Sequence, residues 1–468
     1  MAVNHMPRAR PESRVLEAAI AALAATFGNR LVTSRAVCQQ HGNTTTWIAC
    51  QPPDAVVYPQ STGDVQQIIR ICRCRGVPII PFGTGTSFEG SVNAPFGGIS
   101  IDFKDMNKVV AVHAEDFDCV VEEGVTRNQL NEHLRDRGLF FCVDPGADAS
   151  LGGMASTRAS GTTTVRYGTM KDNVLAMNVV LASGEIMSTS RRARKSSAGY
   201  DFTRLIVGAE GTLGVIIELT LKLHGIPEAV SVGVCQFPSI AAACDAAIAG
   251  IQAGISFARI ELLDEVQVRA CNKDAKLGLP ETPMLLLEFH GTDTSVKEQS
   301  ERFGEVAGEY TTSRFEWANH PDERSRLWKA RHHVFWANKS FMPGADVIVT
   351  DVCVPISRLA ECVTETKGDI ERTGLVAPIV GHVGDGNFHC CVLVTPSDVG
   401  ALKRAEGFVE RLVGRALAME GTCTGKHAVG QGKMSYLEPE FGEATVNAMR
   451  EVKRALDPLW LMNPGKVL

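Results

Sequence analysis

The sequence predicts an α+β protein with two principal domains and a short, partly helical C-terminal segment. A chain of 468 residues is too long for one ordinary hydrophobic core. Strand, helix and strand follow one another between residues 55 and 82, and strands alternate with long helices from 229 to 420. Ile226-Pro227 interrupts the pattern. We therefore expect domains at 1–226 and 227–420, and a C-terminal segment at 421–468.

The composition argues against several partners and locations. The net charge of -6 gives no basic footprint, so we expect no nucleic-acid partner. No apolar run is long enough to cross a bilayer, so we expect no integral membrane segment. The 14 cysteines are scattered and form no Cys-x-x-Cys repeat. This favours reduced thiols and a cytoplasmic location over a disulfide or zinc framework.

The first domain is expected to open with an amphipathic helix over residues 12–27. Ser61-Thr62-Gly63-Asp64 predicts the cap of a helix that ends near Gly76 and lies between two short strands. A second helix is expected over 126–137, ending at Gly138. Further strands are expected at 98–103, 108–113, 118–123, 174–182 and 213–223.

Two glycine-rich stretches of the first domain lack the large apolar residues of core elements. The loop Pro-Phe-Gly-Thr-Gly-Thr-Ser-Phe-Glu-Gly at 81–90 leaves backbone N–H groups free, and its glycines let an anion approach the backbone. It does not match the full Gly-x-Gly-x-x-Gly fingerprint, and taken alone it favours a plain turn. Residues 144–174 predict a long ordered loop, and such loops usually carry function.

The second domain is expected to combine an antiparallel sheet with long helices on one side of it. Strands are expected at 230–237, 257–263, 284–289, 347–354, 376–382 and 388–394. Helices are expected at 238–252, 295–308, 321–340, 357–373 and 398–419, and a further helix at 440–456 belongs to the C-terminal segment.

Histidines stand in two further glycine-rich segments. Gly-His-Val-Gly-Asp-Gly-Asn-Phe-His at 381–389 places His382 and His389 on either side of a turn, and Gly-Thr-Cys-Thr-Gly-Lys-His-Ala-Val-Gly at 421–430 adds His427. If His382 and His389 each lie on a strand, the turn returns them to one side. Two imidazoles there suit a divalent metal such as zinc or manganese. A lone histidine is usually a satisfied core residue, but three in glycine-rich loops favour a site.

Three segments together resemble the FAD-binding domain of vanillyl-alcohol-oxidase-type flavoproteins. They are the loop at 81–90, the run from Asp144 through Val174, and Gly-Ala-Glu-Gly-Thr-Leu-Gly-Val-Ile at 208–216. The resemblance keeps their order and covers essentially the whole chain. It implies a domain of this type followed by an α+β substrate (cap) domain. It further implies FAD held by Pro81, Gly83, Thr84, Gly85, Thr86, Ser87, Gly90, Pro145, Gly146, Gly152, Gly153, Ser156, Gly161, Tyr167, Glu210, Gly214, Ile216 and Asn463.

The attachment of the flavin is expected to be non-covalent. Relatives that tether the flavin often do so through a histidine in the first loop, and residues 81–90 contain neither histidine nor cysteine.

Within this superfamily the chain is most similar to FAD-dependent D-lactate dehydrogenases of the cytochrome-linked kind. Thr-Asp-Val-Cys-Val-Pro-Ile-Ser-Arg-Leu at 350–359, the segment 381–389 and the terminal Asn-Pro-Gly-Lys-Val-Leu carry the likeness. It implies hydride transfer from a small D-2-hydroxy acid, D-lactate first, to FAD. No Cys-x-x-Cys-His haem motif is present. The electrons are therefore expected to pass to a separate cytochrome, quinone or electron-transfer flavoprotein.

Oxidation of a 2-hydroxy acid requires a cation for the carboxylate and a base for the hydroxyl. Arg331 is the best anchor for the carboxylate, because a guanidinium binds a carboxylate with two parallel hydrogen bonds. Without the family resemblance, an arginine on the surface of a helix would be the favoured interpretation of this residue. The resemblance implies that His427 takes the hydroxyl proton, and that His382 and His389 bind a metal with a glutamate that precedes the third histidine. Lys426 stands in place of that glutamate, so the third ligand is missing.

Lys426 leaves three interpretations open. A deprotonated lysine could ligate the metal, at a cost, since its reference pKa is about 10.4. The lysine could instead abolish the site. Or its ammonium could replace the metal and supply positive charge where an alkoxide develops, which makes Lys426 a catalytic residue. We favour the third interpretation narrowly over the second.

Other functions remain alternatives. D-2-hydroxyglutarate and glycolate oxidation are near relatives, but Ile348-Val349-Thr350 is apolar where glutarate-type relatives tend to place an extra cation. This favours a substrate with a short or apolar side chain. A flavin-binding subunit without catalysis follows if Lys426 abolishes the site. A non-redox flavin transferase of the ether-lipid type shares the fold, but its histidine-rich run is not seen.

Overall fold

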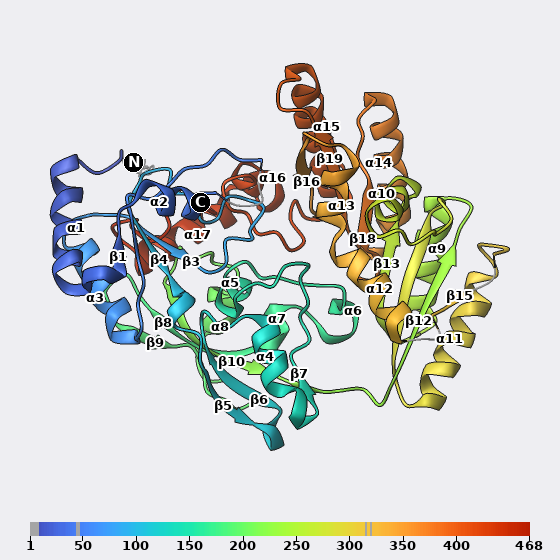
Figure 1. Cartoon of the computed structure of the whole chain (residues 1–468), viewed down its shortest axis with the longest axis horizontal. Helices are drawn as coiled ribbons and strands as arrows, with labels where there is room; N and C mark the ends of the chain where they lie inside the picture. Colours follow the sequence, from blue (N-terminus) through green and yellow to red (C-terminus); the bar gives the residue numbers. More distant parts are fainter. Residues whose placement is uncertain (1–8, 44–46, 314–315, 319–320) are drawn as a thin grey trace.

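The computed structural model describes residues 9–43, 47–313, 316–318 and 321–468. Two mixed α/β bodies lie side by side, and the C-terminal segment returns from the second body to the first (Figure 1). The strands β1 to β11 lie between residues 31 and 225, and β12 to β19 lie between 229 and 394. The position 226, where we expect a domain boundary, therefore falls between β11 and β12.

The first body contains a small sheet with the order β1-β2-β4-β3. Strands β2 and β3 run parallel to β4, while β1 is antiparallel to β2. The apolar faces of α1 and α3 pack on this sheet in one hydrophobic core. Ser61 accepts a hydrogen bond from the Asp64 backbone N–H, as the predicted cap requires. The bounds are α1 Ser13–Phe27, β1 Leu31–Val32, α2 Arg35–His41, β2 Ala55–Val57, α3 Thr62–Arg73, β3 Ile79–Phe82 and β4 Ile99–Asp102.

A second sheet of the first body is antiparallel, with the order β5-β6-β10-β8-β9. Helix α4 packs against it and begins with a capping box between Thr126 and Gln129. A single turn of 3-10 helix then ends at Gly138, whose φ of 67° is left-handed. The bounds are β5 Val109–His113, β6 Asp118–Glu122, α4 Arg127–Leu134, β7 Leu139–Phe140, β8 Val174–Val180, β9 Ile186–Ser188, α8 Phe202–Ile206, β10 Val215–Lys222 and β11 His224–Gly225.

The expectation of one long loop over 144–174 was wrong in part. Three short helices interrupt it: α5 Leu151–Ser156, α6 Thr164–Tyr167 and α7 Met170–Asn173. Each has at most six residues, which is too short for a helical period to appear in the sequence. Tertiary packing stabilises them, because Leu151, Met154 and Met170 are fully buried in the core of the first body.

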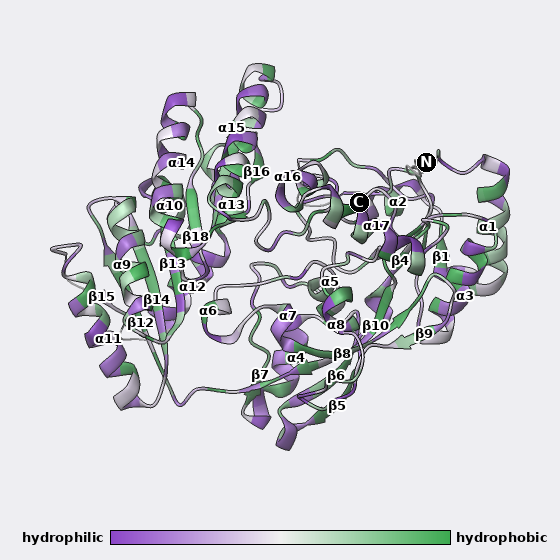
Figure 2. Cartoon of the chain, turned by 180° about the vertical axis from the view of Figure 1, so that it is seen from behind, coloured by the Kyte–Doolittle hydropathy of each residue, from purple (hydrophilic) through white to green (hydrophobic). Residues whose placement is uncertain are grey.

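The second body is an antiparallel sheet with the order β15-β12-β14-β13-β18-β19-β16, and β17 also pairs with β19. Helices cover both faces of this sheet, so the expectation of helices on one side was wrong. Leu285 and Leu287 share a core with α9, α11, α14 and α15, while Met284 and Leu286 contact α10, α12 and α13. Figure 2 shows hydrophilic and hydrophobic bands along α11 and α14, as expected for helices with one buried face.

Two predicted elements of the second body are interrupted, and one helix was not predicted. The expected helix 321–340 is broken at His333, and the expected strand 347–354 is broken at Thr350-Asp351, whose polar groups turn inward. Helix α10 was not predicted. The bounds are β12 Ala229–Gln236, α9 Ile240–Gln252, β13 Phe257–Leu263, α10 Glu265–Ala275, β14 Met284–Gly291, α11 Asp293–Ala307, β15 Glu316–Trp317, α12 Pro321–His332, α13 Val334–Phe341, β16 Asp346–Val349, β17 Val352–Cys353, α14 Leu359–Thr373, β18 Ile379–His382, β19 Asn387–Val394 and α15 Val399–Ala418.

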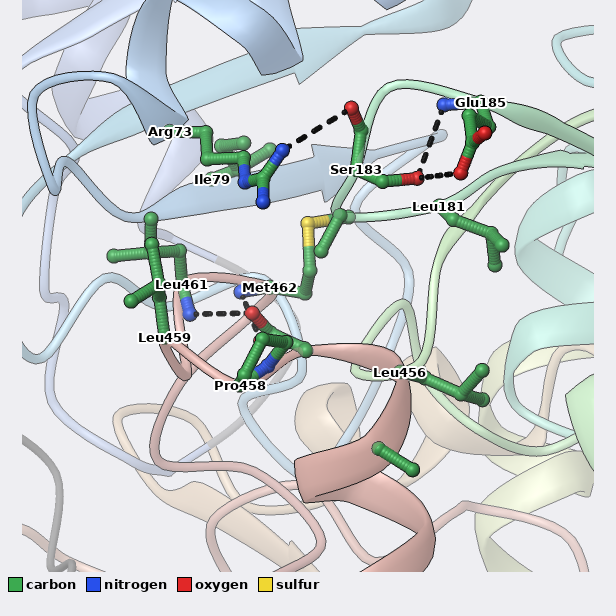
Figure 3. Close-up of a pocket in the computed structure, with 13 residues that line it drawn as sticks. Arg73, Ile79, Leu181, Ser183, Glu185, Leu456, Pro458, Leu459, Leu461 and Met462 are labelled. Atoms are coloured by element: carbon green, nitrogen blue, oxygen red, sulfur yellow. Dashed lines mark hydrogen bonds between the residues drawn. The ribbon is translucent and has the colours of Figure 1, made fainter.

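The C-terminal segment holds α16 Leu437–Phe441 and α17 Glu443–Leu456, and its end packs on β3. The Ile79 N–H donates to the Leu461 carbonyl at 2.8 Å, and the Asn463 N–H donates to the Ile79 carbonyl at 2.7 Å. Met462 and Pro458 of this segment line a cavity of about 240 Å³ together with Ile79 of β3 (Figure 3). The pairing brings Asn463 next to the glycine-rich loop that follows β3.

Two compositional predictions can be compared with the described residues. All 14 cysteines are unpaired there, as predicted. Within the described ranges we also find no helix that is both long and apolar enough to cross a membrane.

Candidate active site

A cavity of about 330 Å³ extends from the glycine-rich loops of the first body to the sheet of the second. Of the residues predicted to hold a cofactor, those that line it are Pro81, Gly83, Thr84, Gly85, Thr86, Ser87, Pro145, Gly146, Gly153, Ser156, Glu210 and Asn463. The other end is lined by Arg331, His389, Lys426 and His427. The cavity thus joins the two groups of residues that the sequence singled out.

Six predicted cofactor residues do not line this cavity: Gly90, Gly152, Gly161, Tyr167, Gly214 and Ile216. Most of them have a packing role instead. A Cβ on Gly161 would overlap Asp144, and one on Gly214 would lie 2.6 Å from Val179. The Tyr167 hydroxyl hydrogen-bonds with His290 at 2.7 Å. Contact of these six residues with a cofactor stays a prediction.

The loop after β3 has the geometry of an anion cradle. Gly85 has a φ of 67°, and a Cβ there would lie 2.8 Å from the Phe82 ring. Gly83 lies so close to the Ser150 hydroxyl that any side chain would displace it. Only glycine fits these two positions without rearrangement, and the backbone remains accessible to a ligand. These features fit the phosphates of a dinucleotide cofactor such as FAD.

The C-terminal segment closes the cofactor end of the cavity. Asn463 donates hydrogen bonds from Nδ2 to the Glu210 carbonyl at 2.7 Å and to the Ser91 carbonyl at 2.9 Å. The Glu210 carboxylate accepts from the backbone N–H groups of Val429 and Gly430, at 2.9 and 3.0 Å. Segments far apart in the sequence are therefore held together at the wall of this cavity.

The two histidines of the 381–389 segment lie on neighbouring strands, as the sequence suggested. His389 pairs with Val380, two residues before His382, so both side chains lie on one face of the sheet. Their rings are 5.5 Å apart, and His389 stacks on His427 at 4.8 Å. His382 and His389 are each 4% exposed, so burial holds the pKa of both well below the ordinary value.

Lys426 points into this histidine cluster. Its Nζ contacts the His382 Nε2. A lysine ammonium can only donate hydrogen bonds, so His382 Nε2 must accept one from it. The His382 Nδ1 then carries the proton and donates to the Glu261 carboxyl at 2.5 Å. Burial, followed by the charge of Arg331, lowers the pKa of Lys426 to about 8. The lysine therefore remains mostly charged at neutral pH.

Asp351 organises the segment that carries Lys426 and His427. Its Oδ2 accepts the backbone N–H groups of both residues at 2.7 Å and the Thr424 hydroxyl at 3.0 Å, while its Oδ1 accepts from Asn387 at 2.9 Å. Burial raises the pKa of Asp351, but its interaction with His427, followed by that with Lys433, outweighs burial and holds this pKa well below its usual range. Burial lowers the pKa of His427 to about 3, so this imidazole is neutral at pH 7.

The position of Lys426 does not fit a divalent metal at His382. At His382, the Nε2 lone pair that a metal would take already faces Lys426, and an ammonium repels a dication. Asp351, His389 and His427 form another trio with ligand atoms within 4.8 Å. Asp351 already accepts four hydrogen bonds, whereas His389 donates from Nδ1 to the Thr350 carbonyl at 3.0 Å, and its Nε2, like His427 Nδ1, has no hydrogen-bond partner among the described residues. Two imidazole nitrogens of this second trio are therefore available, but the charge of Lys426 acts on both histidines and would oppose a dication there.

Arg331 lies at the end of α12, and its side chain is 7% exposed. Its Nε donates to Glu261 at 2.8 Å, and its Nη2 makes an ion pair with the same carboxylate. Glu261 therefore ties Arg331 and His382 together, and burial raises the pKa of Glu261 to about 7. Arg331 also lines the cavity.

An ionic cluster that sequence reasoning missed joins the two bodies beside Arg331. Asp144 is held by Arg259 at 3.1 Å and lies 3.5 Å from His332. Arg259 also pairs with Glu288 at 3.2 Å. Burial raises the pKa of Asp144. The charge of Arg259, followed by the hydrogen bond with His332, outweighs burial and holds this pKa well below its usual range. The cluster fixes the second body against the loop that begins at Asp144.

Apolar side chains form the wall between the glycine-rich end of the cavity and the end that Arg331 and Lys426 line. Phe88 packs on His427 at 4.8 Å and on Phe335 at 5.4 Å, and Val349 and Val380 line the same space. Ile348 does not line it, because this residue belongs to the core on the opposite face of the sheet. Of the three residues Ile348, Val349 and Thr350, for which the sequence predicted a place near the substrate, Val349 is the one found among the described residues that line the cavity.

The missed residues left one kind of signal in the sequence. Glu261 stands inside the apolar strand Phe-Ala-Arg-Ile-Glu-Leu-Leu, and Asp351 stands inside Ile-Val-Thr-Asp-Val-Cys-Val. An acidic residue in an apolar strand must have a partner, because an unpaired buried charge is too costly. The partners themselves depend on pairings between distant strands, such as Glu261 with His382.

Residues 226–467 match the family model described as FAD linked oxidases, C-terminal domain, and residues 53–190 match the one described as FAD binding domain. A Danio rerio protein named probable D-lactate dehydrogenase, mitochondrial, is 51% identical over 92% of this chain and 88% of its own. An Arabidopsis thaliana D-lactate dehydrogenase (cytochrome) is 47% identical, covering 89% and 73%. The glycolate oxidase subunit of Bacillus subtilis is 32% identical, covering 89% of both chains.

Solved structures confirm the predicted type of fold. The p-cresol methylhydroxylase structure has a TM-score of 0.81 at 16% identity, and 4-ethylphenol oxidase from Gulosibacter chungangensis has 0.80 at 19%. Each alignment covers 98% of both chains. At this identity the likeness concerns the fold alone.

Proposed function

The chain belongs to the family of FAD-linked oxidases, and we propose that it is an FAD-dependent dehydrogenase of small D-2-hydroxy acids, with D-lactate as its main substrate. One observation carries the proposal. An arginine, two histidines and a lysine line one end of a cavity whose other end is lined by the glycine-rich loops assigned to the cofactor. The curated relatives at 40% to 51% identity, whose names are D-lactate dehydrogenase, support the same substrate.

Each step of the reaction has a residue suited to it. The Arg331 guanidinium pairs with the substrate carboxylate. The neutral His427 imidazole takes the hydroxyl proton, and Asp351, 4.0 Å from His427 Nδ1, stabilises the resulting imidazolium. FAD, when bound, supplies the acceptor for the hydride that leaves Cα. Loss of this proton and hydride converts the alcohol to the 2-oxo acid.

The wall of the cavity favours monocarboxylates. Phe88, Phe335, Val349 and Val380 would face the substrate side chain, and none of them could pair with a second carboxylate. This wall makes D-2-hydroxyglutarate the weaker alternative. Glycolate has no side chain to fill the same space, so it is expected to bind less tightly than D-lactate.

We also infer that the Lys426 ammonium acts where relatives are expected to use a metal. The ammonium contacts His382 and is buried, so it would stabilise negative charge that develops on the substrate oxygen. Metal analysis of the purified protein, paired with turnover before and after chelation, tests this inference. Little stoichiometric zinc or manganese and unchanged turnover are expected. One tightly held ion per chain, with turnover lost on its removal and regained on its return, contradicts it.

Electrons are proposed to leave to a separate acceptor, as the cytochrome-type names of the relatives suggest for those proteins. An artificial electron-accepting dye can therefore replace the natural acceptor in a first assay. D-lactate should reduce the dye and yield pyruvate, while L-lactate should not. Equal rates with both enantiomers, or none with either although FAD is bound, would argue against the proposed function.

A further inference from the structure

A buried carboxyl in the cofactor half of the cavity was not among the predicted site residues. Glu123 follows β6, is 5% exposed and lines the cavity. Its backbone carbonyl accepts from the Gly152 N–H at 3.0 Å, and a Cβ on Gly152 would overlap its side chain. Its Oε1 lies 3.8 Å from the position that a Cβ on Gly83 would take. Glu123 therefore stands beside the loop that we assign to the cofactor phosphates.

The surroundings of Glu123 provide nothing to balance a negative charge. Oε2 is enclosed and has no hydrogen-bond partner among the described residues. The nearby charge that acts on it is Asp102, another carboxylate, which hydrogen-bonds with the buried His41 at 2.9 Å. Burial, followed by Asp102, raises the pKa of Glu123 well above its ordinary value. Enclosure without a cation therefore favours the neutral carboxylic acid over the carboxylate.

The cofactor half of the cavity contains no cation among its described lining residues. From Pro81 to Val92, from Pro145 to Ser160, and at Glu210, Gly211 and Asn463, the lining side chains include neither lysine nor arginine. The other acidic group there, Glu210, is already paired with Ser91 and two backbone N–H groups. A pyrophosphate bound here would have to be held by neutral donors, and an ionised Glu123 would repel it.

We propose that Glu123 binds FAD as a protonated acid, donating a hydrogen bond from its carboxyl O–H to a phosphate oxygen. A carboxyl keeps the geometry of a carboxylate but gains one donor when protonated. Rotation about its last bond can direct this donor toward the cavity. The proposal rests on FAD binding and is independent of which hydroxy acid the enzyme oxidises.

The test is the dissociation constant of FAD as a function of pH, measured by flavin fluorescence on the full chain after mild removal of its own FAD. Wild-type protein should bind FAD most tightly at low pH, and affinity should fall as pH rises through the folded pKa of Glu123. Glu123→Gln keeps a donor at all pH values, so it should match wild type at pH 6 and lose the pH dependence. Glu123→Leu should weaken binding roughly threefold to tenfold at pH 6.

The neighbouring Glu122→Gln is the matched control. Glu122 accepts from the Lys108 backbone outside the cavity, so this variant should retain the wild-type pH profile. Affinity that is flat with pH in the wild type and equal in the Gln and Leu variants would overturn the proposal. So would a wild type that binds more tightly at high pH, because Glu123 would then accept from a cofactor hydroxyl as a carboxylate.

A second readout applies even if Glu123→Leu does not fold. Infrared difference spectra of ¹³C-labelled protein should contain the C=O band of a protonated carboxylic acid that shifts when unlabelled FAD binds. The band should be absent from Glu123→Gln and present in Glu122→Gln. A wild-type spectrum without such a band would mean that Glu123 is ionised, which contradicts the proposal. Because neither readout uses substrate, failure of D-lactate oxidation would be seen separately.

Discussion

Replacement of Lys426 by methionine removes the buried ammonium while nearly keeping the shape of the side chain. A unit charge about 4 Å from a developing alkoxide contributes at most about 4 kcal/mol at an effective dielectric constant of 20. Loss of one preorganised donor of this kind typically costs about 10²- to 10³-fold in rate. We therefore expect the rate of flavin reduction by D-lactate to fall about 10²- to 10³-fold in Lys426→Met. The absorption spectrum of the oxidised flavin should be unchanged.

The assay is anaerobic stopped-flow at 450 nm or nearby, where oxidised flavin absorbs, with D-lactate at saturation. Lys403→Met, at an exposed position of α15, is the matched control and should keep the wild-type rate. Lys426→Glu places an oxygen ligand beside His382, so its rate should become dependent on added zinc or manganese, with one ion bound per chain. A wild-type rate in Lys426→Met, with or without metal, would refute the argument that the ammonium acts in the reaction.

Three further predictions concern Arg331, the attachment of the flavin and the backbone at Ala428. Arg331→Ala should leave the flavin spectrum intact and cost roughly 2 to 5 kcal/mol in substrate binding, since it removes a charge-assisted bidentate contact. Flavin bleaching at wild-type D-lactate concentrations would show that the carboxylate anchor lies elsewhere. Acid precipitation should release the yellow colour into solution, because residues 81–90 hold no histidine or cysteine to tether FAD; colour retained in the pellet would contradict this. Ala428 has a left-handed φ of 69°, so Ala428→Gly should raise the free energy of unfolding by about 1 kcal/mol in denaturant titrations; no gain would mean that the backbone relaxes at this position.

The sequence was informative wherever chemistry was concentrated in a short segment. His382 and His389 are separated by one turn, so their proximity followed from the assumption of two paired strands. Lys426 and His427 are adjacent in a glycine-rich loop, and their place beside these histidines came from the family likeness. The loop at 81–90 likewise carries its own signal, because glycines at its close approaches leave no room for side chains.

The sequence was uninformative where the site depends on distant pairings. Glu261 joins Arg331 to His382 only because β13 lies next to β18, a register between residues more than a hundred positions apart. Asp351 accepts from Lys426 and His427 only because a break between β16 and β17 turns it inward. The placement of helices on both faces of the second sheet was missed for a related reason: α10, α12 and α13 pack on one face through contacts between segments that are far apart in the sequence.

The most direct test of the account is an anaerobic titration of the purified yellow protein with D-lactate, in which the absorption spectrum of the flavin is recorded after each addition. The account predicts that D-lactate bleaches the flavin and forms pyruvate, that L-lactate leaves the spectrum unchanged, and that prior chelation makes no difference. A flavin that stays oxidised with D-lactate, yet is bleached by dithionite, would contradict the claim that this site oxidises D-2-hydroxy acids.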